Sequence, residues 1–294
     1  MRILVTGAGG FLGWRCSFLL REHGHEVTAL VRPNGRRRAI AADLDAVEAD
    51  AGDPATRALI AGCDAVLHFA GVPDPASARA DPAAAVRANA GTTVNMLEGC
   101  REHDAGLIYP STVRAAGTVP PDPYALSKRL GEEACRMHPA SATVARLTSV
   151  FGPGQVRWEG ATGAIASFAA RALDGDPIVI PGDPARTRDF LYVDDAILAI
   201  EQIVAQSRWD ELVTIASGVS TPLLRAAELV RDAAGAQSAI ETPGGELPAG
   251  ENESYETDSA SPRLDFPVRP LEEAVQLYVD WLSRHPAAKG RARA

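Results

Sequence analysis

Arg2-Ile-Leu-Val-Thr-Gly-Ala-Gly-Gly-Phe-Leu-Gly13 joins a short β-rich run to three glycines, spaced as Gly7-x-x-Gly10-x-x-Gly13. Residues 11–23, which follow, have the apolar spacing of a helix. A strand, a glycine loop and a helix in this order are the context that a dinucleotide-binding fingerprint requires. Gly7 would permit the tight turn, Gly10 would let the backbone approach a pyrophosphate on the helix N-terminus, and Gly13 would let helix and strand pack closely. The alternative is a glycine-rich turn that binds nothing.

Short β-rich runs alternate with helical patterns along the rest of the first half of the chain. Expected helices cover residues 54–61 and 81–103, and expected strands cover residues 26–31, 47–50, 64–69, 106–110 and 143–146. This alternation predicts an α/β fold with a doubly wound parallel sheet, the Rossmann fold. Ligands of such sheets bind at the carboxyl ends of the strands.

The second half of the chain predicts a smaller C-terminal α/β portion that binds substrate. Residues 1–148 are expected to form the dinucleotide-binding domain, and residues 189–216 are expected to return to it through a strand over 211–215. Residues 149–188 and 217–286 are expected to form the substrate-binding portion, with a last amphipathic helix that begins at Pro270. The small and basic stretch 287–294 is expected to be a disordered tail.

Composition excludes several classes of protein. The formal net charge of −9 over 294 residues argues against nucleic acid as a partner, since proteins that bind it carry basic patches. No apolar run approaches the length needed to cross a bilayer, and no secretory leader precedes the first strand, so we expect a cytoplasmic protein. The four cysteines are scattered, which predicts free thiols in a reducing compartment, and the histidines form no pattern that implies a metal.

The end of the second expected strand carries information on the coenzyme. An NAD-selective site places an acidic residue about twenty positions beyond the glycines, where it binds the ribose 2′-hydroxyl. This chain has Arg32 there, then Arg36-Arg37-Arg38, and its next carboxylate is Asp43. A guanidinium grips a 2′-phosphate well and contributes little to a neutral hydroxyl. The pattern favours NADP(H), with NAD(H) as the alternative, although 36–38 could equally be a solvated basic loop.

Tyr124-Ala-Leu-Ser-Lys128 places a phenol and an amine one helical turn apart, so both can reach one small region. The chain has only two lysines, which suggests that Lys128 is kept where a compact ammonium is needed. A nearby positive charge would lower the pKa of Tyr124 from its usual value of about 10, and we expect Lys128 to supply it. A surface pair with no such role is the alternative.

Five motifs occur in order: Gly7-x-x-Gly10-x-x-Gly13, Asn89-Ala-Gly-Thr92, Ser111-Thr112, Tyr124-x-x-x-Lys128 and Arg188-Asp-Phe190. Together, over about residues 1–285, they resemble the extended short-chain dehydrogenase/reductase family, which includes nucleotide-sugar epimerases, dehydratases and ketoreductases. The resemblance implies a catalytic triad of Thr112, Tyr124 and Lys128. The residues expected to contact the coenzyme are Gly7, Gly10, Phe11, Leu12, Gly13, Arg32, Asp50, Ala51, Phe69, Ala70, Gly71, Asn89, Tyr124 and Lys128.

Four residues are expected to contact the substrate, which the resemblance identifies as a nucleotide sugar: Ser111, Thr112, Ser149 and Arg188. Ser149 replaces an asparagine that is frequent in the family, which puts the contacts to the diphosphate in doubt. Arg188 could bind a phosphate through a bidentate fork, or form a structural ion pair with Asp189 or Asp194. The family also suggests a homodimer in which two long helices pack across the interface.

The reaction is narrowed by what surrounds the expected triad. Dehydratases of the family carry an Asp-Glu pair directly after the catalytic threonine, whereas this chain has Val113-Arg114, which argues against elimination of water. The compact stretch 111–117 resembles that of 4-ketoreductases of deoxysugar biosynthesis. An NADP(H)-dependent reduction of a nucleotide-linked keto sugar is therefore the favoured function. The alternatives are an NAD-dependent 4-epimerase and, from a different class, a non-catalytic NADP-binding sensor.

Overall fold

The structure is a computed structural model that describes residues 1–33, 44–117, 122–160, 162–247 and 263–286. The expected tail 287–294 and the arginines 36–38 lie outside the described residues. Contacts divide the chain into two compact units, which are described separately. The first holds Met1–Leu147, Ala196–Ile215 and the described residues 263–266, and the second holds Thr148–Asp195, most of Ala216–Glu256 and the described residues from 267 onward.

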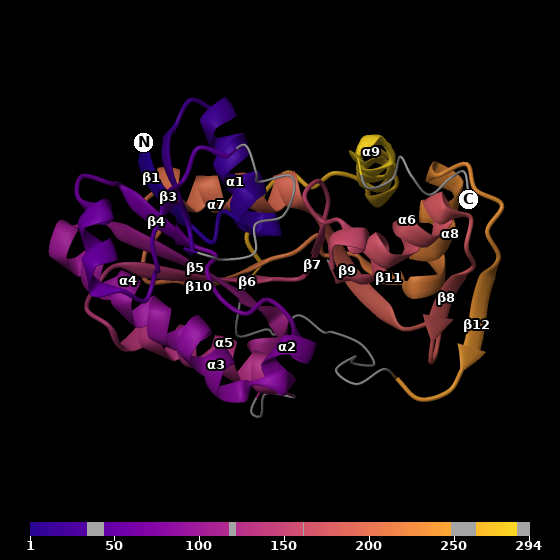
Figure 1. Cartoon of the computed structure of the whole chain (residues 1–294), viewed down its shortest axis with the longest axis horizontal. Helices are drawn as coiled ribbons and strands as arrows, with labels where there is room; N and C mark the ends of the chain where they lie inside the picture. Colours follow the sequence, from indigo (N-terminus) through magenta and orange to yellow (C-terminus); the bar gives the residue numbers. More distant parts are fainter. Residues whose placement is uncertain (34–43, 118–121, 161, 248–262, 287–294) are drawn as a thin grey trace. The chain divides into compact units, whose positions relative to one another are not determined.

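The first unit is built on a parallel sheet of seven strands, ordered β10-β6-β5-β4-β1-β2-β3 (Figure 1). The strands are β1 (Arg2–Thr6), β2 (Glu26–Val31), β3 (Val47–Glu48), β4 (Ala65–His68), β5 (Gly106–Thr112), β6 (Ala142–Leu147) and β10 (Leu212–Ile215). All six neighbouring pairs run parallel. The strand order reverses between β1 and β4, which is the switch point where ligands of such sheets bind. The predicted doubly wound fold is confirmed.

Helices cover both faces of this sheet. Figure 1 shows α1 and α7 on one face, and α4 and α5 on the other. The helical segments of the first unit are α1 (Phe11–Glu22), the 3₁₀ segment η2 (Pro54–Ile60), α2 (Pro75–Ala80), α3 (Pro82–Val86), the π turn η3 (Arg87–Gly91), α4 (Thr92–His103), the 3₁₀ turn η4 (Val113–Ala115), α5 (Pro123–Met137) and most of α7 (Val193–Ala205). Because both faces are covered, the inner strands read as continuous apolar runs, and every residue of β5 is buried.

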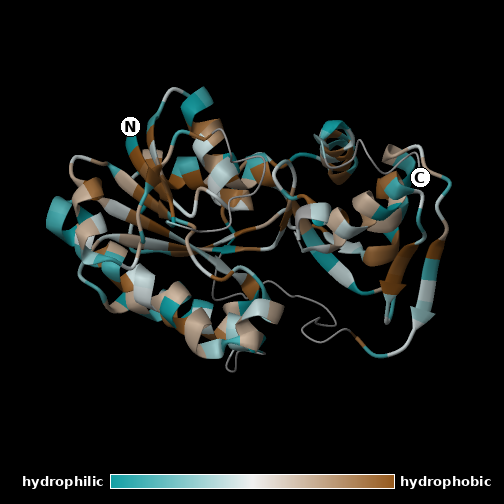
Figure 2. Cartoon of the chain, viewed as in Figure 1, coloured by the Kyte–Doolittle hydropathy of each residue, from teal (hydrophilic) through white to brown (hydrophobic). Residues whose placement is uncertain are grey.

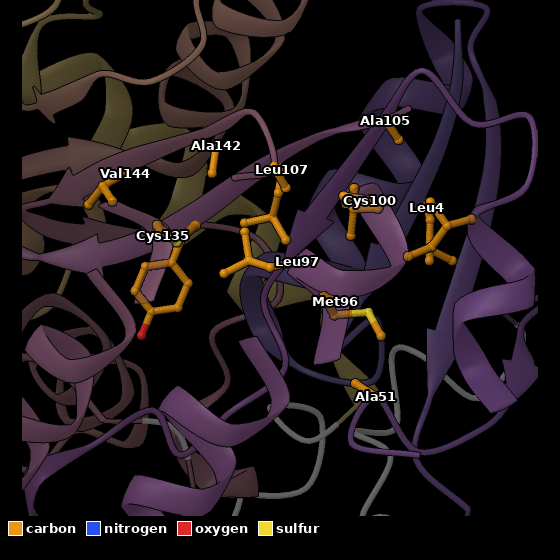
Figure 3. Close-up of a cluster of buried hydrophobic side chains, with 14 of the residues drawn as sticks. Leu4, Ala51, Met96, Leu97, Cys100, Ala105, Leu107, Cys135, Ala142 and Val144 are labelled. Carbon is orange, nitrogen blue, oxygen red and sulfur yellow. The ribbon is translucent and has the colours of Figure 1, made fainter. Parts of the chain in front are cut away.

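The core between the sheet and α4 is formed by aliphatic side chains, with Met96 and Leu97 of α4 fully buried against Leu4 and Leu107 of the strands (Figure 3). Figure 2 shows the same separation in hydropathy, with apolar colour along the strands and polar colour on the outer faces of the helices. Cys100 and Cys135 belong to this core, and all four cysteines of the chain are free thiols.

Aspartate-proline pairs begin three helices of this unit. Asp81 accepts a hydrogen bond from the backbone N–H of Ala84 at 2.8 Å, as expected for an N-cap followed by proline. The helix expected over 81–103 is nevertheless interrupted by the π turn at Arg87–Gly91. The interruption contains Asn89, whose side chain bonds outside the helix, and such single π turns often occur where a side chain has a special position.

The described residues of the second unit form two small sheets and three α-helices. Its three-stranded sheet has the order β11-β9-β7, and the other sheet pairs β12 with β8. The elements are β7 (Ser149–Phe151), the 3₁₀ turn η5 (Arg157–Glu159), α6 (Ala164–Asp174), β8 (Ile178–Pro181), β9 (Thr187–Tyr192), β11 (Ser220–Pro222), α8 (Leu223–Ala233), β12 (Ile240–Gly244) and α9 (Leu271–Arg284). Phe151 packs edge-on against Phe190, Tyr192 and Tyr278, which forms the aromatic centre of this unit.

The boundaries of the units differ from the expected domains at two places. Residues 189–195 belong to the second unit, because β9 pairs with β7 and β11 and not with the large sheet. Residues 263–266 belong to the first unit, where the Leu264 N–H donates to the carbonyl of Thr214 at 2.8 Å. Among the described residues, no helix is long and apolar enough to cross a membrane.

Candidate active site

The glycine loop between β1 and α1 has the geometry that its sequence predicts. Gly7 has a φ of +69°, and a Cβ there would lie 2.6 Å from the carbonyl carbon of Phe69. A Cβ on Gly13 would lie 2.3 Å from the carbonyl oxygen of Gly7. Any side chain at either position would therefore collide with backbone. Helix α1 begins directly after Gly10 with no side-chain cap, so its first N–H groups are available to an anion.

The other residues expected to contact the coenzyme collect at the carboxyl edge of the same sheet. Arg32 follows β2 and is exposed, Asp50 and Ala51 follow β3, and Phe69 and Ala70 follow β4. Because neighbouring parallel strands end at one edge, these positions lie around the glycine loop. A loop that cannot hold a Cβ, beside unpaired helix N–H groups and an exposed guanidinium, fits a phosphorylated dinucleotide.

Asn89 connects the coenzyme edge to helix α5. Its side chain accepts a hydrogen bond from the Val72 N–H at 2.8 Å and donates to the Ser127 hydroxyl at 2.8 Å. Ser127 in turn donates to the backbone carbonyl of Tyr124 at 2.8 Å. With 1% of its surface exposed, Asn89 is enclosed in this network. A Cβ on Gly71 would lie 2.2 Å from its side-chain oxygen, so the network also requires glycine there.

Thr112 and Tyr124 meet at the end of β5. The Thr112 hydroxyl lies near enough to the phenol of Tyr124, in the first turn of α5, to lower the pKa of that phenol. The Thr112 oxygen also accepts a hydrogen bond from the Arg114 N–H at 3.2 Å. Since that oxygen accepts from the backbone, the hydroxyl hydrogen is free to point toward Tyr124 or toward a ligand oxygen.

Burial raises the pKa of Tyr124 to about 12. The strongest opposing charge is the guanidinium of Arg114, which lowers the pKa, while the carboxylates of Asp122 and Asp74 raise it and the Thr112 hydrogen bond lowers it. The expectation that Lys128 supplies the lowering charge is corrected here, because Arg114 occupies that place. At neutral pH the phenol is protonated, which is the state required of a general acid.

Lys128 lies one turn along α5, over a second phenol. Its Nζ is 4.4 Å from the ring centroid of Tyr109, a strand residue that is fully buried. The Tyr109 hydroxyl donates to the carbonyls of Asn89 and Lys128, at 3.1 and 3.3 Å. Burial lowers the pKa of Lys128 to about 8, and the nearby Glu132 carboxylate opposes the change. Tyr109 is not among the site residues that the sequence predicts, although its alternation with Ser111 on β5 was the available signal.

Ser111, which was expected to contact substrate, lies in a buried ion pair. Its hydroxyl donates to Glu132 Oε1 at 2.5 Å, and Arg146 of β6 donates to Glu132 Oε1 and Oε2 at 3.0 and 2.7 Å. The physical reason is the alternation of a strand, which sends the side chains of Ser111 and Thr112 in opposite directions. The hydroxyl of Ser111 is therefore committed to the interior, and only Thr112 meets the phenol.

The two remaining expected substrate residues belong to the second unit. Ser149 opens β7, and Arg188 on β9 is 6% exposed, with its Nη1 donating to the Thr187 carbonyl at 2.7 Å. The Asp189 carboxylate accepts hydrogen bonds from the Thr148 hydroxyl and from the N–H groups of Ser217 and Gly218, at 3.0, 2.9 and 2.7 Å. Asp189 thus ties the start of β7 to the loop after β10.

The sequence profile of the NAD dependent epimerase/dehydratase family matches residues 3–216. The chain belongs to this family. A dTDP-glucose 4,6-dehydratase from Streptomyces niveus is 29% identical over 267 residues, which cover 80% of this chain and 78% of the relative. A dTDP-4-dehydro-6-deoxy-D-allose reductase from Streptomyces bikiniensis is 25% identical, with 96% of each chain covered.

Solved structures confirm the fold of this family member. A UDP-glucose 4-epimerase from Thermotoga maritima superposes with a TM-score of 0.79 at 23% identity, and covers 97% of this chain and 99% of its own. The protein is an NAD(P)-dependent enzyme of the epimerase/dehydratase family. Within the described residues, no three histidine, cysteine, aspartate or glutamate side chains gather as a metal site.

Proposed function

We propose that the protein is an NADP(H)-dependent oxidoreductase that reduces a keto group of a nucleotide-linked deoxysugar. The observation that carries the proposal is that Thr112, at the end of β5, and a protonated Tyr124, in the first turn of α5, come together at the edge of the sheet that the glycine loop shares. The reductase relative acts on a nucleotide-linked deoxysugar according to its name, and it matches this chain almost from end to end.

When bound, the nicotinamide coenzyme would provide the hydride that the keto carbon needs for reduction. Thr112 donates a hydrogen bond to the keto oxygen, and Tyr124 gives up its proton to that oxygen as general acid. Lys128, held over the Tyr109 ring, places an ammonium one turn from the phenol, where it would bind the nicotinamide ribose. Glycines 7, 10 and 13 and the first turn of α1 would hold the pyrophosphate.

Val113-Arg114 supports reduction over dehydration. The family's dehydratases have Asp-Glu at these two positions. Neither Val113 nor the guanidinium of Arg114 can act as a general acid or base at neutral pH. Elimination of water requires a proton to be removed and another to be delivered. The similarity to a dehydratase in overall sequence therefore does not extend to these two residues.

The test is Tyr124→Phe, assayed as NADPH oxidation with a nucleotide-linked 4-keto-6-deoxyhexose. We expect turnover to fall by about 10²–10⁴-fold, because the general acid is lost, while coenzyme binding persists. Tyr192→Phe, a matched change in the second unit, should leave turnover near that of the native protein. Unchanged turnover in Tyr124→Phe would defeat the assignment of the general acid, whereas absence of turnover in the native protein would favour the non-catalytic sensor.

The preference for NADP(H) is a separate part of the proposal and rests on the exposed Arg32 at the end of β2. In Arg32→Ala, NADPH binding should weaken by tenfold or more and NADH binding should change little, as measured by fluorescence titration. Equal losses for both coenzymes would reject this account. Tightly held NAD in the purified protein would instead favour the 4-epimerase, as in the solved epimerase structures that contain NAD.

We also propose a homodimer through α4 and α5. Leu126, Leu130 and Met137 form one exposed stripe along α5, with 45%, 40% and 76% of their surfaces accessible, and Val94 on α4 is 44% exposed. Leu130→Lys should shift sedimentation toward a monomer, whereas Leu277→Lys on α9, which is 42% exposed in the native chain, should not. A monomeric native protein would overturn this part.

The free thiols and the net charge bear on the location of the enzyme and on its class of substrate. The four free cysteines support a cytoplasmic location, since thiols of this kind persist in reducing compartments. The net charge of −9 supports a small-molecule substrate and not a nucleic acid.

A further inference from the structure

Arg114 and Asp122 form a buried ion pair beside the phenol of Tyr124. The guanidinium Nη2 donates to Asp122 Oδ2, and the two side chains are only 9% and 5% exposed. A pair of charges removed from water to this degree stabilises the fold only when its geometry is good and further hydrogen bonds satisfy it. Its place beside the proposed general acid suggests another reason for its presence.

Each member of the pair holds one of the two reacting groups. The backbone N–H of Arg114 donates to the Thr112 hydroxyl oxygen at 3.2 Å. Asp122 caps α5, with Oδ1 accepting from the Ala125 N–H at 2.9 Å, and this cap fixes the turn that carries Tyr124. Thr112 also lies beside Tyr124, so the four residues form one cluster.

The pair also sets the charge that the phenol experiences. The charged groups that act on Tyr124 are Arg114, Asp122 and Asp74 of the α2 cap, with Lys128 one turn along the same helix. Arg114 lowers the pKa of Tyr124, and both carboxylates raise it. Arg114 and Asp122 therefore shift the pKa of the phenol in opposite directions, although both help to fix its position.

We propose that Arg114 and Asp122 are a positioning pair, which keeps the Tyr124 phenol in register with the Thr112 hydroxyl and balances the charge beside it. The inference rests on the proposed function, because it assigns a role in proton transfer from Tyr124. Neither residue needs to touch the substrate. Arg114 stands where the family's dehydratases have a glutamate, so the same position serves elimination in those enzymes and orientation of the phenol here.

Because Arg114 and Asp122 shift the pKa of Tyr124 in opposite directions, their replacements should have opposite effects, which a purely structural pair would not produce. At saturating NADP⁺, the positive charge of the nicotinamide would lower the pKa of Tyr124 into the measurable range, and the low-pH limb of kcat/KM for alcohol oxidation would then report loss of the Tyr124 proton. In Arg114→Gln, where Asp122 is left unopposed, the limb should move to higher pH by about one unit. In Asp122→Ser, where the cap survives and Arg114 is left unopposed, the limb should move to lower pH by about one unit.

Two further variants separate charge from geometry. Arg114→Lys should return the limb toward the native position, because it restores the charge, while kcat stays reduced by the loss of the guanidinium geometry. Arg101→Gln, which removes an exposed guanidinium on α4, should change neither. Movement of the limb in the same direction in Arg114→Gln and Asp122→Ser, or no movement in either, would overturn the proposal.

A second measurement separates this inference from the proposed function. With tyrosine labelled at its ring carbon, NMR of the NADP⁺-bound protein identifies the Tyr124 signal by its absence in Tyr124→Phe. The signal should titrate at lower pH in Asp122→Ser than in Arg114→Gln, whether or not the enzyme reduces a keto sugar. A protein without turnover but with this order of titration would refute the reductase and retain the pair; identical titration would refute the pair.

Discussion

Two buried ion pairs flank the first turns of α5, and they differ in what they hold. Arg114–Asp122 lies at the Tyr124 end, where the Arg114 N–H donates to the Thr112 hydroxyl and Asp122 accepts from the Ala125 N–H in the first turn of α5. Arg146–Glu132 lies at the Lys128 end and joins α5 to β6, with Ser111 as a third member. One pair connects a loop to a helix cap, while the other connects a strand to the middle of a helix.

The difference between the pairs shows how α5 can position the phenol of Tyr124 and the ammonium of Lys128 independently. Arg146–Glu132 is satisfied by three hydrogen bonds to its carboxylate and lies within the sheet–helix interface. We therefore expect it to act mainly on stability, because removal of either partner leaves a buried charge unpaired. Arg114–Asp122 should act mainly on the reaction, because its charges face the phenol.

The largest effect is expected from Glu132→Gln, which breaks the pair at the Lys128 end. The buried guanidinium of Arg146 loses its counter-charge, so the free energy of unfolding should fall by about 3–5 kcal/mol. Chemical denaturation at neutral pH measures it. Glu133→Gln, one residue along and 42% exposed, should change it by less than about 0.5 kcal/mol. Equal losses in the two variants would mean that the buried pair has no special weight.

Lys128→Met should raise the free energy of unfolding at neutral pH, the opposite of the change expected for Glu132→Gln. Folding lowers the pKa of Lys128 from 10.5 to about 8, so below pH 8 the folded chain carries an ammonium that is costly to bury. Methionine removes this cost, and the variant should be more stable than the native protein by about 3 kcal/mol at pH 7, while losing its activity.

The pH dependence of that gain follows from the same two values. Between the folded pKa of about 8 and the unfolded value of 10.5, the unfolded chain binds more protons than the folded one. The free energy of unfolding of the native protein therefore rises with pH in this window, relative to that of Lys128→Met. The gain should disappear by about pH 10.5 in paired denaturation curves. A difference that stays constant from pH 7 to that value would contradict the lowered pKa.

The contrast between the two pairs also separates what the sequence could predict from what it could not. Gly7, Gly13 and Tyr124-x-x-x-Lys128 are local patterns, and their spacing alone predicts a turn or a shared helix face. Asp81-Pro82 likewise predicts a cap from adjacent residues. The unexpected partners are all distant in sequence: Glu132 is bound by Ser111 and Arg146, and Lys128 by the ring of Tyr109.

Two structural differences have the same origin. Residues 189–195 were expected to return to the first domain with the rest of 189–216, yet β9 pairs Phe190 with Ser149, which lies 41 positions earlier in the chain. The π turn at Asn89 accompanies hydrogen bonds from its side chain to Val72 and Ser127. Helix propensity, which depends on local sequence, contains no information about these distant partners. Local periodicity identifies elements, but long-range pairing decides which sheet a short strand joins.

Tyr109→Phe tests the contact that connects Lys128 to the sheet. The ring under the ammonium remains, but the carbonyls of Asn89 and Lys128 lose a donor, so the free energy of unfolding should fall by about 1–2 kcal/mol. Tyr278→Phe is the matched control in the second unit, since its hydroxyl donates to the Gln155 carbonyl at 2.5 Å. Both should lose stability, but only Tyr109→Phe should weaken coenzyme binding, by displacing Lys128. Equal binding in the two variants would show that the phenol serves packing alone.

The smallest effect separates the two roles of Asp122. Asp122→Ser and Asp122→Ala both remove the ion pair with Arg114, but only serine can still accept the Ala125 N–H. The difference between their free energies of unfolding should therefore be the cost of the cap, about 1 kcal/mol, with serine the more stable. Circular dichroism during denaturation measures it. If the two variants were equally stable, the cap would contribute nothing, and the ion pair alone would hold the turn that carries Tyr124.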